Sequence, residues 1–319
     1  MSTRPEVLLV MDPVPSLNPR KDTSLALVRE AQLRGMPCFV AEIPDLEIHS
    51  GEARARVRSL DVDLAASPFF SLGEVHTRPL AEFGTILMRK DPPVDPAFVW
   101  ATQVMELAMR DGTRVINHPE ALRNINEKLA ISRFSQLCAP TLTAAHAQTF
   151  KAFIEEHQEV VLKPLDGMGG KSIFRLHRND PNVNVVLETL TQNGTQLAMA
   201  QAYLPEIRQG DKRILMIGGQ AWPRLLARIP AAGESRGNLA AGGRGEVRDL
   251  GAAEAAIAEE VGPWLREQGV WFAGLDVIGD KLTEINVTSP TCVREIENAD
   301  GSNIAGALWD AFEQPLRGC

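Results

Sequence analysis

Strand-like and helix-like segments alternate along the first 117 residues, and this alternation restricts the fold more than any other feature of the chain. Short apolar runs favour buried strands, and the stretches between them repeat apolar residues at helical spacing. Asp22 is a suitable N-cap for the first helix, and Gly35 and Gly112 stand where the two helices should end. The pattern predicts an open α/β sheet with ligands beyond its strand ends. The expected strands are 6–11, 37–43, 85–88 and 113–117, and the expected helices are 22–34 and 95–111.

The rest of the chain predicts two α+β modules. The first would contain strands 160–163, 172–176 and 196–201 and helices 127–137, 151–157 and 183–192. In the second, Gly218-Gly219 separates the strand-like runs 213–217 and 222–229, which predicts a tight hairpin. A helix at 252–268, a hairpin of 270–278 with 281–287 and a helix at 302–316 would follow. We therefore expect units at 1–124, 125–204 and 205–319.

Charge and composition exclude several classes of protein. A net charge of −8 with a pI of about 5.4 argues against a nucleic-acid partner that relies on a broad basic surface. No apolar run approaches the roughly 18 residues of a membrane span, and the N-terminus lacks the pattern of a secretion signal. The four cysteines show no metal-binding or redox spacing. We expect reduced thiols in a cytoplasmic protein without membrane or nucleic-acid partners.

A glycine-rich turn at 166–172 lies between two strand-like segments. Leu165 stands where a P-loop needs its first glycine, and a strand follows where a P-loop needs a helix. The turn is then either a tight hairpin or a loop whose backbone N–H groups lie over a polyphosphate. Lys163 favours the phosphate interpretation because it ends the preceding strand in a chain with only 8 lysines among 33 basic residues. Lys128 would be a second phosphate ligand; lysines in structural positions are the alternative.

The second hairpin allows two registers. A two-residue turn at 279–280 would pair Asp276 with Thr283, whereas a three-residue loop at 279–281 would pair Asp276 with Glu284. The second register is favoured because it collects an apolar face of Leu275, Val277, Ile285 and Val287. It also places Asp276, Glu284 and Asn286 on one face. Three oxygen ligands without histidine suit magnesium that bridges nucleotide phosphates; a solvated hairpin face is the alternative.

Two arginines precede this hairpin. Arg213 and Arg228 lie in the strands of the first hairpin, where either could hold a transferring phosphoryl group or a developing oxyanion. Arginines that are merely exposed at the surface are the alternative.

These features resemble the ATP-grasp superfamily and, within it, the prokaryotic glutathione synthetase family. Five segments carry the resemblance in order along nearly the whole chain: VMDP at 10–13, LMRKDPP at 87–93, VLKPLDGMGG at 161–170, GNLAAGGRG at 237–245 and LTEINVTSPT at 282–291. The resemblance implies an N-terminal open α/β sheet domain followed by an ATP-grasp fold. That fold would consist of a small α+β lid module and a C-terminal α+β module. A homo-oligomer is also implied.

The resemblance further implies a ligase that joins γ-glutamylcysteine to glycine through an acyl phosphate while ATP is cleaved to ADP and phosphate. Arg213, Arg228 and Arg236 would be catalytic, and Mg²⁺, or Mn²⁺, would be held by Asp276, Glu284 and Asn286. Asp12, Arg89 and Ser289 would contact the peptide substrate. ATP would contact two lysines, the glycine loop, a hinge strand that meets adenine, and an acid that meets ribose: Lys128, Lys163, Asp166, Gly167, Gly169, Gly170, Gln201, Ala202, Tyr203, Leu204 and Asp211.

The segment 230–245 is the expected lid of this site. Its glycines and alanines cannot bury enough apolar area to order it alone, which predicts mobility. Closure would protect the acyl phosphate from water, with Arg236 as the main contact. A surface loop without function is the alternative, although 16 residues without structure are uncommon in a compact domain.

Two other functions stay open. A ligase of the D-alanine–D-alanine type would share Lys163 and Glu284 but not the segments 89–93 and 237–245. A nucleotide-binding regulator without turnover would be expected to have a broken metal triad.

Overall fold

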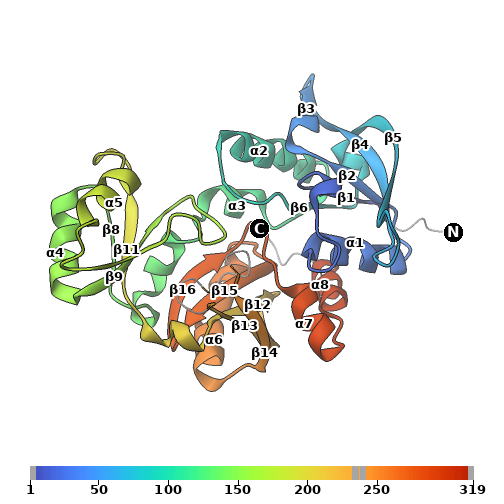
Figure 1. Ribbon diagram of the computed structural model, residues 1–319. Coiled ribbons are helices and arrows are strands. Elements are labelled where there is room, and N and C mark those ends of the chain that lie inside the picture. The colour runs from blue at the N-terminus through green and yellow to red at the C-terminus, as the bar shows by residue number, and fades with distance from the viewer. Residues whose placement is uncertain (1–4, 232–236, 238–241, 315–319) are drawn as a thin grey trace.

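The computed structural model describes residues 5–231, 237 and 242–314, and these form three β-sheets that follow one another along the chain. In Figure 1 the first sheet is blue, the second module (green to yellow) projects to the left, and the third lies below in orange and red. Within these residues no helix combines the length and apolarity needed to cross a bilayer. The predicted unit boundaries at 124 and 204 stay a prediction.

The first sheet has a parallel half and an antiparallel half, in the order β3-β4-β2-β1-β6-β7 with β5 paired to β4. The parallel half, with β1 between β2 and β6, confirms the predicted alternation. The antiparallel half was not predicted, although β4 alternates buried residues (Ala53, Ala55, Val57, Leu60 and Val62) with polar ones, the pattern of a strand with one face in the core. The strands are β1 (Val7–Val10), β2 (Cys38–Ala41), β3 (Leu46–His49), β4 (Glu52–Val62), β5 (Phe70–Pro79), β6 (Thr85–Met88) and β7 (Arg114–Ile116).

The helices around this sheet come from both ends of the chain. Helix α1 (Thr23–Leu33) begins at its predicted cap, where Asp22 accepts a hydrogen bond from Leu25 N at 2.9 Å. Helix α2 (Pro96–Arg110) begins where predicted, and Asp95 caps it by accepting a hydrogen bond from Phe98 N at 2.8 Å. A short α3 (Pro119–Asn124) follows β7. From the other end, α7 (Val293–Asp300), which was not predicted, and α8 (Ile304–Phe312) lie beside α1 (Figure 1).

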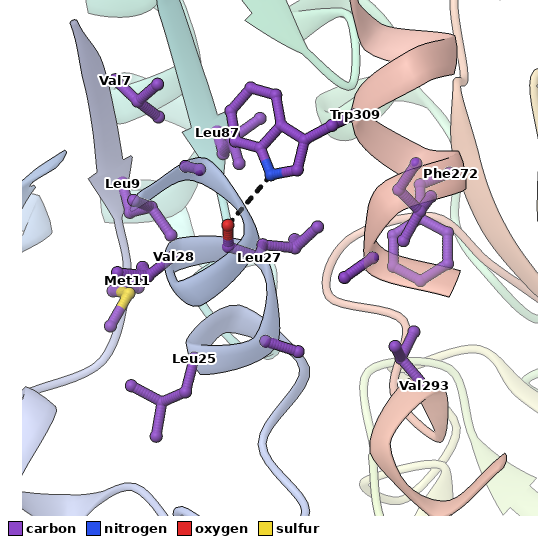
Figure 2. Close-up of a cluster of buried hydrophobic side chains, with 14 of the residues drawn as sticks. Val7, Leu9, Met11, Leu25, Leu27, Val28, Leu87, Phe272, Val293 and Trp309 are labelled. Carbon is purple, nitrogen blue, oxygen red and sulfur yellow. Dashed lines mark hydrogen bonds between the residues drawn. The ribbon is translucent and has the colours of Figure 1, made fainter. Parts of the chain in front are cut away.

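One hydrophobic cluster therefore joins the first and last parts of the chain. Figure 2 shows Trp309 of α8 facing α1, with its indole nitrogen donating a hydrogen bond to Leu27 O at 2.9 Å. Apolar side chains of β1 and α1 pack in the same cluster as Phe272 and Val293. The C-terminal helix is thus part of the core of the first sheet.

We expect Trp309→Ala to lower the free energy of unfolding by about 3–5 kcal/mol, because it removes a fully buried aromatic side chain and leaves a cavity. Trp100→Ala is the matched control, since Trp100 on α2 is 63% exposed and should change stability by only about 0.5 kcal/mol. Denaturant unfolding followed by circular dichroism measures both. Equal effects of the two substitutions would contradict the packing role of α8.

The second sheet is antiparallel, in the order β10-β9-β11-β8. The pairing of β9 with β10 confirms the predicted strand–glycine loop–strand. The helix predicted at 127–137 is a 3₁₀ helix, η4 (Leu129–Leu137), which is interrupted at Phe134 (φ −122°, ψ 44°), and Asn126 Oδ1 caps its first N–H groups. The other elements are β8 (Thr141–Ala144), which was not predicted, β9 (Glu159–Pro164), β10 (Phe174–His177), β11 (Ala198–Ala202), α4 (Ala147–His157) and α5 (Val183–Leu190).

The third sheet is also antiparallel, in the order β14-β13-β12-β15-β16. Its first hairpin turns at Gly218 and Gly219 with φ of 57° and 77°, as the glycine pair predicts. The helix predicted at 252–268 is α6 (Ala252–Glu267). The strands of the sheet are β12 (Asp211–Ile217), β13 (Gln220–Ile229), β14 (Arg244–Asp249), β15 (Phe272–Ile278) and β16 (Lys281–Asn286).

The predicted lid segment 230–245 lies mostly outside the described residues, and Arg236 with it. At the end of the segment, Arg244 and Gly245 belong to β14, where they pair with Ile229 and Arg228, so the predicted loop is too long there. Gly237 lies against the sheet: a Cβ at this position would be 2.5 Å from Arg228 O. A larger residue would not fit this close approach of two backbones.

Candidate active site

A cavity of about 660 Å³ is lined by residues of all three sheets and their connections. Most of the predicted site residues meet in it. Asp166 and Arg89 are not among its lining residues, and Arg236 lies outside the described residues. The predicted residues that line it are Asp12, Lys128, Lys163, Gly167, Gly169, Gly170, Gln201, Ala202, Tyr203, Leu204, Asp211, Arg213, Arg228, Asp276, Glu284, Asn286 and Ser289.

The hairpin of β15 and β16 combines the strand pairing of one predicted register with the turn length of the other. Asp276 pairs with Glu284, as the apolar face predicts, and Gly274 pairs with Asn286. The predicted three-residue loop is wrong, because Ile278 pairs with Lys281 across a two-residue turn. A β-bulge at Thr283 absorbs the extra residue, and its hydroxyl donates to Asp276 O at 3.1 Å.

The oxygen-bearing face of this hairpin is strongly charged. Arg213 binds Asp276 through two hydrogen bonds of 2.5 and 3.1 Å, and Arg228 Nη2 lies 2.9 Å from Asp276 Oδ2. Burial opposes ionisation of this carboxyl, but the two guanidinium groups hold the pKa of Asp276 well below its usual range. Arg213 and Arg228 are therefore buried partners of an acid and not exposed at the surface.

The donors on this face fit a hard divalent cation. Asp276 and Glu284 supply carboxylates, and Asn286 donates through Nδ2 to Gly274 O at 3.2 Å, which leaves its amide oxygen as an acceptor. No group of three His, Cys, Asp or Glu side chains that could bind a metal occurs among the described residues. The candidate ligands of the cation on this hairpin face are therefore two carboxylates and one side-chain amide. Oxygen donors of this kind suit Mg²⁺ or Mn²⁺.

Two buried lysines lie against this acidic face. Lys128 Nζ is 3.0 Å from Glu284 Oε1 and donates to Gly167 O at 2.5 Å, which ties the glycine loop to the hairpin. Lys163 Nζ donates to Thr283 O at 3.1 Å. Burial lowers the pKa of Lys163, while the charge of Glu284 opposes that shift. The glycine loop between β9 and β10 has positive φ at Gly169 and Gly170, so both positions favour glycine.

The hinge between the second and third sheets borders the same cavity. The N–H groups of Ala202 and Tyr203 already donate to Pro140 O and Glu159 O, at 2.9 and 3.0 Å. Asp211 accepts a hydrogen bond from Arg228 at 2.5 Å, while its other oxygen, Oδ1, is buried without a partner in the described part of the chain. Burial raises the pKa of Asp211 to about 6.

Arg89 is buried and binds protein groups from two distant parts of the chain. Its Nε donates to Ser24 Oγ at 3.0 Å and its Nη2 to Pro290 O at 2.9 Å, which links α1 to the segment after β16. Ser289, which lines the cavity, donates to Arg89 O at 3.2 Å. Asp12 forms an ion pair of 2.7 Å with Lys90. A contact of Arg89 with substrate stays a prediction, and its observed contacts are structural.

Two residues that position the site were missed by sequence reasoning. Asn117 at the end of β7 donates to Phe272 O and Val287 O, both at 2.7 Å, and accepts from two backbone N–H groups of β15 and the residue before it. Glu127 Oε1 accepts from Val287 N, Thr288 N and Thr288 Oγ1 at 2.8–2.9 Å. The sequence offered little to identify them: Asn117 is a polar residue at a strand end, and Glu127 is an acid next to Lys128.

The contacts of Glu127 predict a difference between two substitutions. Glu127→Ala should lower the free energy of unfolding by about 2–4 kcal/mol, because three buried donors lose their acceptor. Glu127→Gln keeps an oxygen at this position and removes a charge that burial disfavours, since burial raises the pKa of Glu127. We expect its stability to stay within about 1 kcal/mol of the parent. Thermal melts of both variants test this, and equal losses would contradict it.

Comparisons with known proteins show the family to which the chain belongs. The model of the prokaryotic glutathione synthetase N-terminal domain matches residues 6–123, and that of the prokaryotic glutathione synthetase ATP-grasp domain matches 127–301. The chain is 54% identical to a glutathione synthetase of Pseudomonas putida over 97% of this chain and 98% of that one. It is 51% identical to a glutathione synthetase of Escherichia coli K12, with the same coverage.

Solved structures confirm the ATP-grasp fold that the resemblance implies. D-cycloserine synthetase DcsG superimposes with a TM-score of 0.66 at 15% identity, over 96% of this chain and 100% of that chain. The ATP-grasp ligase PsnB, solved with minimal precursor, Mg and ADP, gives a TM-score of 0.60 at 17% identity over 96% of each chain. At such low identity these two structures show the fold alone. The matched family models and the close relatives together show that the chain belongs to the prokaryotic glutathione synthetase family.

Proposed function

We propose that this protein joins γ-glutamylcysteine to glycine at the expense of ATP, forming glutathione, ADP and phosphate. One observation carries the proposal: two buried lysines and a hairpin face with three oxygen donors meet in a single cavity. Membership of the glutathione synthetase family supports this pair of substrates over those of other ATP-grasp ligases.

In this proposal ATP lies between the second and third sheets. Lys128 and Lys163 would contact its phosphates, and the N–H groups of the glycine loop would cover them. At the hinge, the N–H of Leu204 has no hydrogen-bond partner in the described part of the chain and is available to adenine. The unpartnered Oδ1 of Asp211 would accept a hydrogen bond from a ribose hydroxyl.

Asp276, Glu284 and Asn286 would hold the divalent cation, Mg²⁺ or Mn²⁺. When bound, such a cation offsets the negative charge of the phosphates and polarises the transferring phosphoryl group. Arg213 and Arg228 keep Asp276 ionised, so this oxygen ligand needs no deprotonation at neutral pH.

The chemistry requires an activated carboxylate. An oxygen of the cysteinyl carboxylate attacks the γ-phosphorus of ATP and ADP leaves, which produces an acyl phosphate. The uncharged amine of glycine then attacks the carbonyl carbon, phosphate leaves, and the amine nitrogen loses its proton. Arg213 and Arg228 border the cavity where negative charge would develop, and enclosure of the reactants would limit hydrolysis of the acyl phosphate.

Phosphate release measured with γ-glutamylcysteine alone, glycine alone and both together tests the proposal. We expect substantial release only with both, together with one glutathione per phosphate. Release with D-alanine instead would support a D-alanine–D-alanine ligase, and ATP binding without turnover would support a regulator.

A homo-oligomeric state and a cytoplasmic location belong to the same proposal. Light scattering of the purified protein tests the first, and cell fractionation tests the second.

A further inference from the structure

The cavity wall on the side of the first sheet carries two charged groups that the proposed ATP chemistry does not use. Lys21 lies in the connection between β1 and α1, and Glu295 lies in the first turn of α7. Helices α1 and α7 are in contact, so two segments far apart in the sequence build this wall together (Figure 1).

Lys21 and Lys171 both line the cavity without a partner for the ammonium in the described part of the chain, but Lys171 follows the glycine loop, whereas Lys21 lies on the wall beside the first sheet. Lys128 pairs with Glu284, Lys163 binds Thr283 O, and Lys90 pairs with Asp12. The ammonium of Lys21 makes no hydrogen bond or ion pair within the described part of the chain, although it borders the cavity and is exposed there.

Glu295 is a partly buried acid with a free oxygen. Its Oε2 is shielded from solvent and has no hydrogen-bond partner among the described residues. Burial raises the pKa of Glu295, and Lys21 is near enough to oppose that shift, yet no ion pair joins the two side chains. Asp12 and Asp22 on the same wall are already engaged, the first by Lys90 and the second by the start of α1.

We propose that Lys21 binds the α-carboxylate and Glu295 binds the α-ammonium of the γ-glutamyl end of the peptide substrate. This inference rests on the proposed function. A positive and a negative side chain that lie near each other without pairing complement a ligand that carries both charges on one carbon. Each contact would be a charge-assisted hydrogen bond.

Glycine also carries an amine and a carboxylate, but its chemistry argues against this place. The glycine nitrogen must be uncharged to attack the acyl phosphate, and an adjacent carboxylate would stabilise its protonated form. The γ-glutamyl ammonium takes no part in the reaction and can stay protonated. The same pair of contacts would select the γ-linked peptide, because the α-linked isomer holds its free carboxylate three carbons from the ammonium.

Substrate analogues combined with variants test the inference. Glutaryl-cysteine lacks the α-ammonium, and 4-aminobutanoyl-cysteine lacks the α-carboxylate. With the parent enzyme each analogue should lose about 10- to 100-fold in kcat/KM relative to γ-glutamylcysteine. In Glu295→Gln the loss with glutaryl-cysteine should shrink to about 3-fold or less, while the loss with 4-aminobutanoyl-cysteine persists. Lys21→Met should show the reverse pattern, and in both variants the KM for glycine should be unchanged.

Controls separate this role from a structural one. Glu259→Gln and Lys151→Met alter exposed residues of α6 and α4 and should leave every ratio unchanged. The inference would be overturned if each analogue lost the same factor in kcat/KM with the parent and with the variants, or if the variants raised only the KM for glycine.

Asp91→Asn is a further variant to test, because Asp91 also lines the cavity. If the loss with glutaryl-cysteine shrinks in Asp91→Asn and not in Glu295→Gln, the assignment of Glu295 is wrong. If the parent enzyme forms glutathione, the proposed function holds whatever the variants show. If the parent forms none, the proposed function itself is refuted.

Discussion

Glu284→Gln is expected to lower kcat by about 10²- to 10³-fold while the protein still binds nucleotide. The substitution removes one anionic oxygen from the proposed cation site and leaves Asp276 and Asn286 in place. It also breaks the 3.0 Å ion pair with Lys128, whose ammonium keeps its hydrogen bond to Gly167 O. Steady-state turnover at several magnesium concentrations, together with nucleotide binding by calorimetry, measures the two effects separately.

Asp280→Asn is the control for this experiment. Asp280 lies in the turn of the same hairpin with a side chain that is 68% exposed, so turnover should be unchanged. Near-normal turnover of Glu284→Gln at limiting magnesium would rule out Glu284 as a ligand.

Lys163→Met is expected to weaken ATP binding by about 10- to 100-fold with little change in stability. Methionine keeps the length of the apolar stem but removes the ammonium that we assign to the phosphates. The loss of the hydrogen bond to Thr283 O should be offset because a buried cation, whose pKa burial lowers, no longer has to be desolvated. Binding of a non-hydrolysable ATP analogue and a thermal melt test the two parts.

Lys281→Met, at the exposed end of the same hairpin, should leave ATP affinity unchanged. A Lys163→Met variant that melts early and binds ATP normally would show that Lys163 has a structural role.

Local patterns in the sequence predicted the elements that are regular and half-buried or fully buried. The parallel strands β1, β2, β6 and β7, the cap at Asp22, the hairpin turn at Gly218-Gly219 and the pairing of Asp276 with Glu284 follow from hydrophobic spacing and turn residues. Two kinds of segment were missed: α7 has little apolar surface, and β4 was overlooked although its buried and polar residues alternate as in a strand with one face in the core. Cooperative pairing with neighbours stabilises these elements more than their own propensity does.

The sequence alone determined the chemical inventory of the site: the glycine loop, the lysine at its entrance, and two acids and an amide that one strand register collects on a single face. It also carried the family resemblance, because those segments are contiguous in the chain. Only the tertiary structure decided how the groups are partnered. Asp276 binds Arg213 and Arg228, Arg89 is buried against Pro290 O, and α8 completes the core of the first sheet. These contacts join residues that are dozens to hundreds of positions apart, and no local periodicity encodes which distant charge or surface will be met when the three sheets pack.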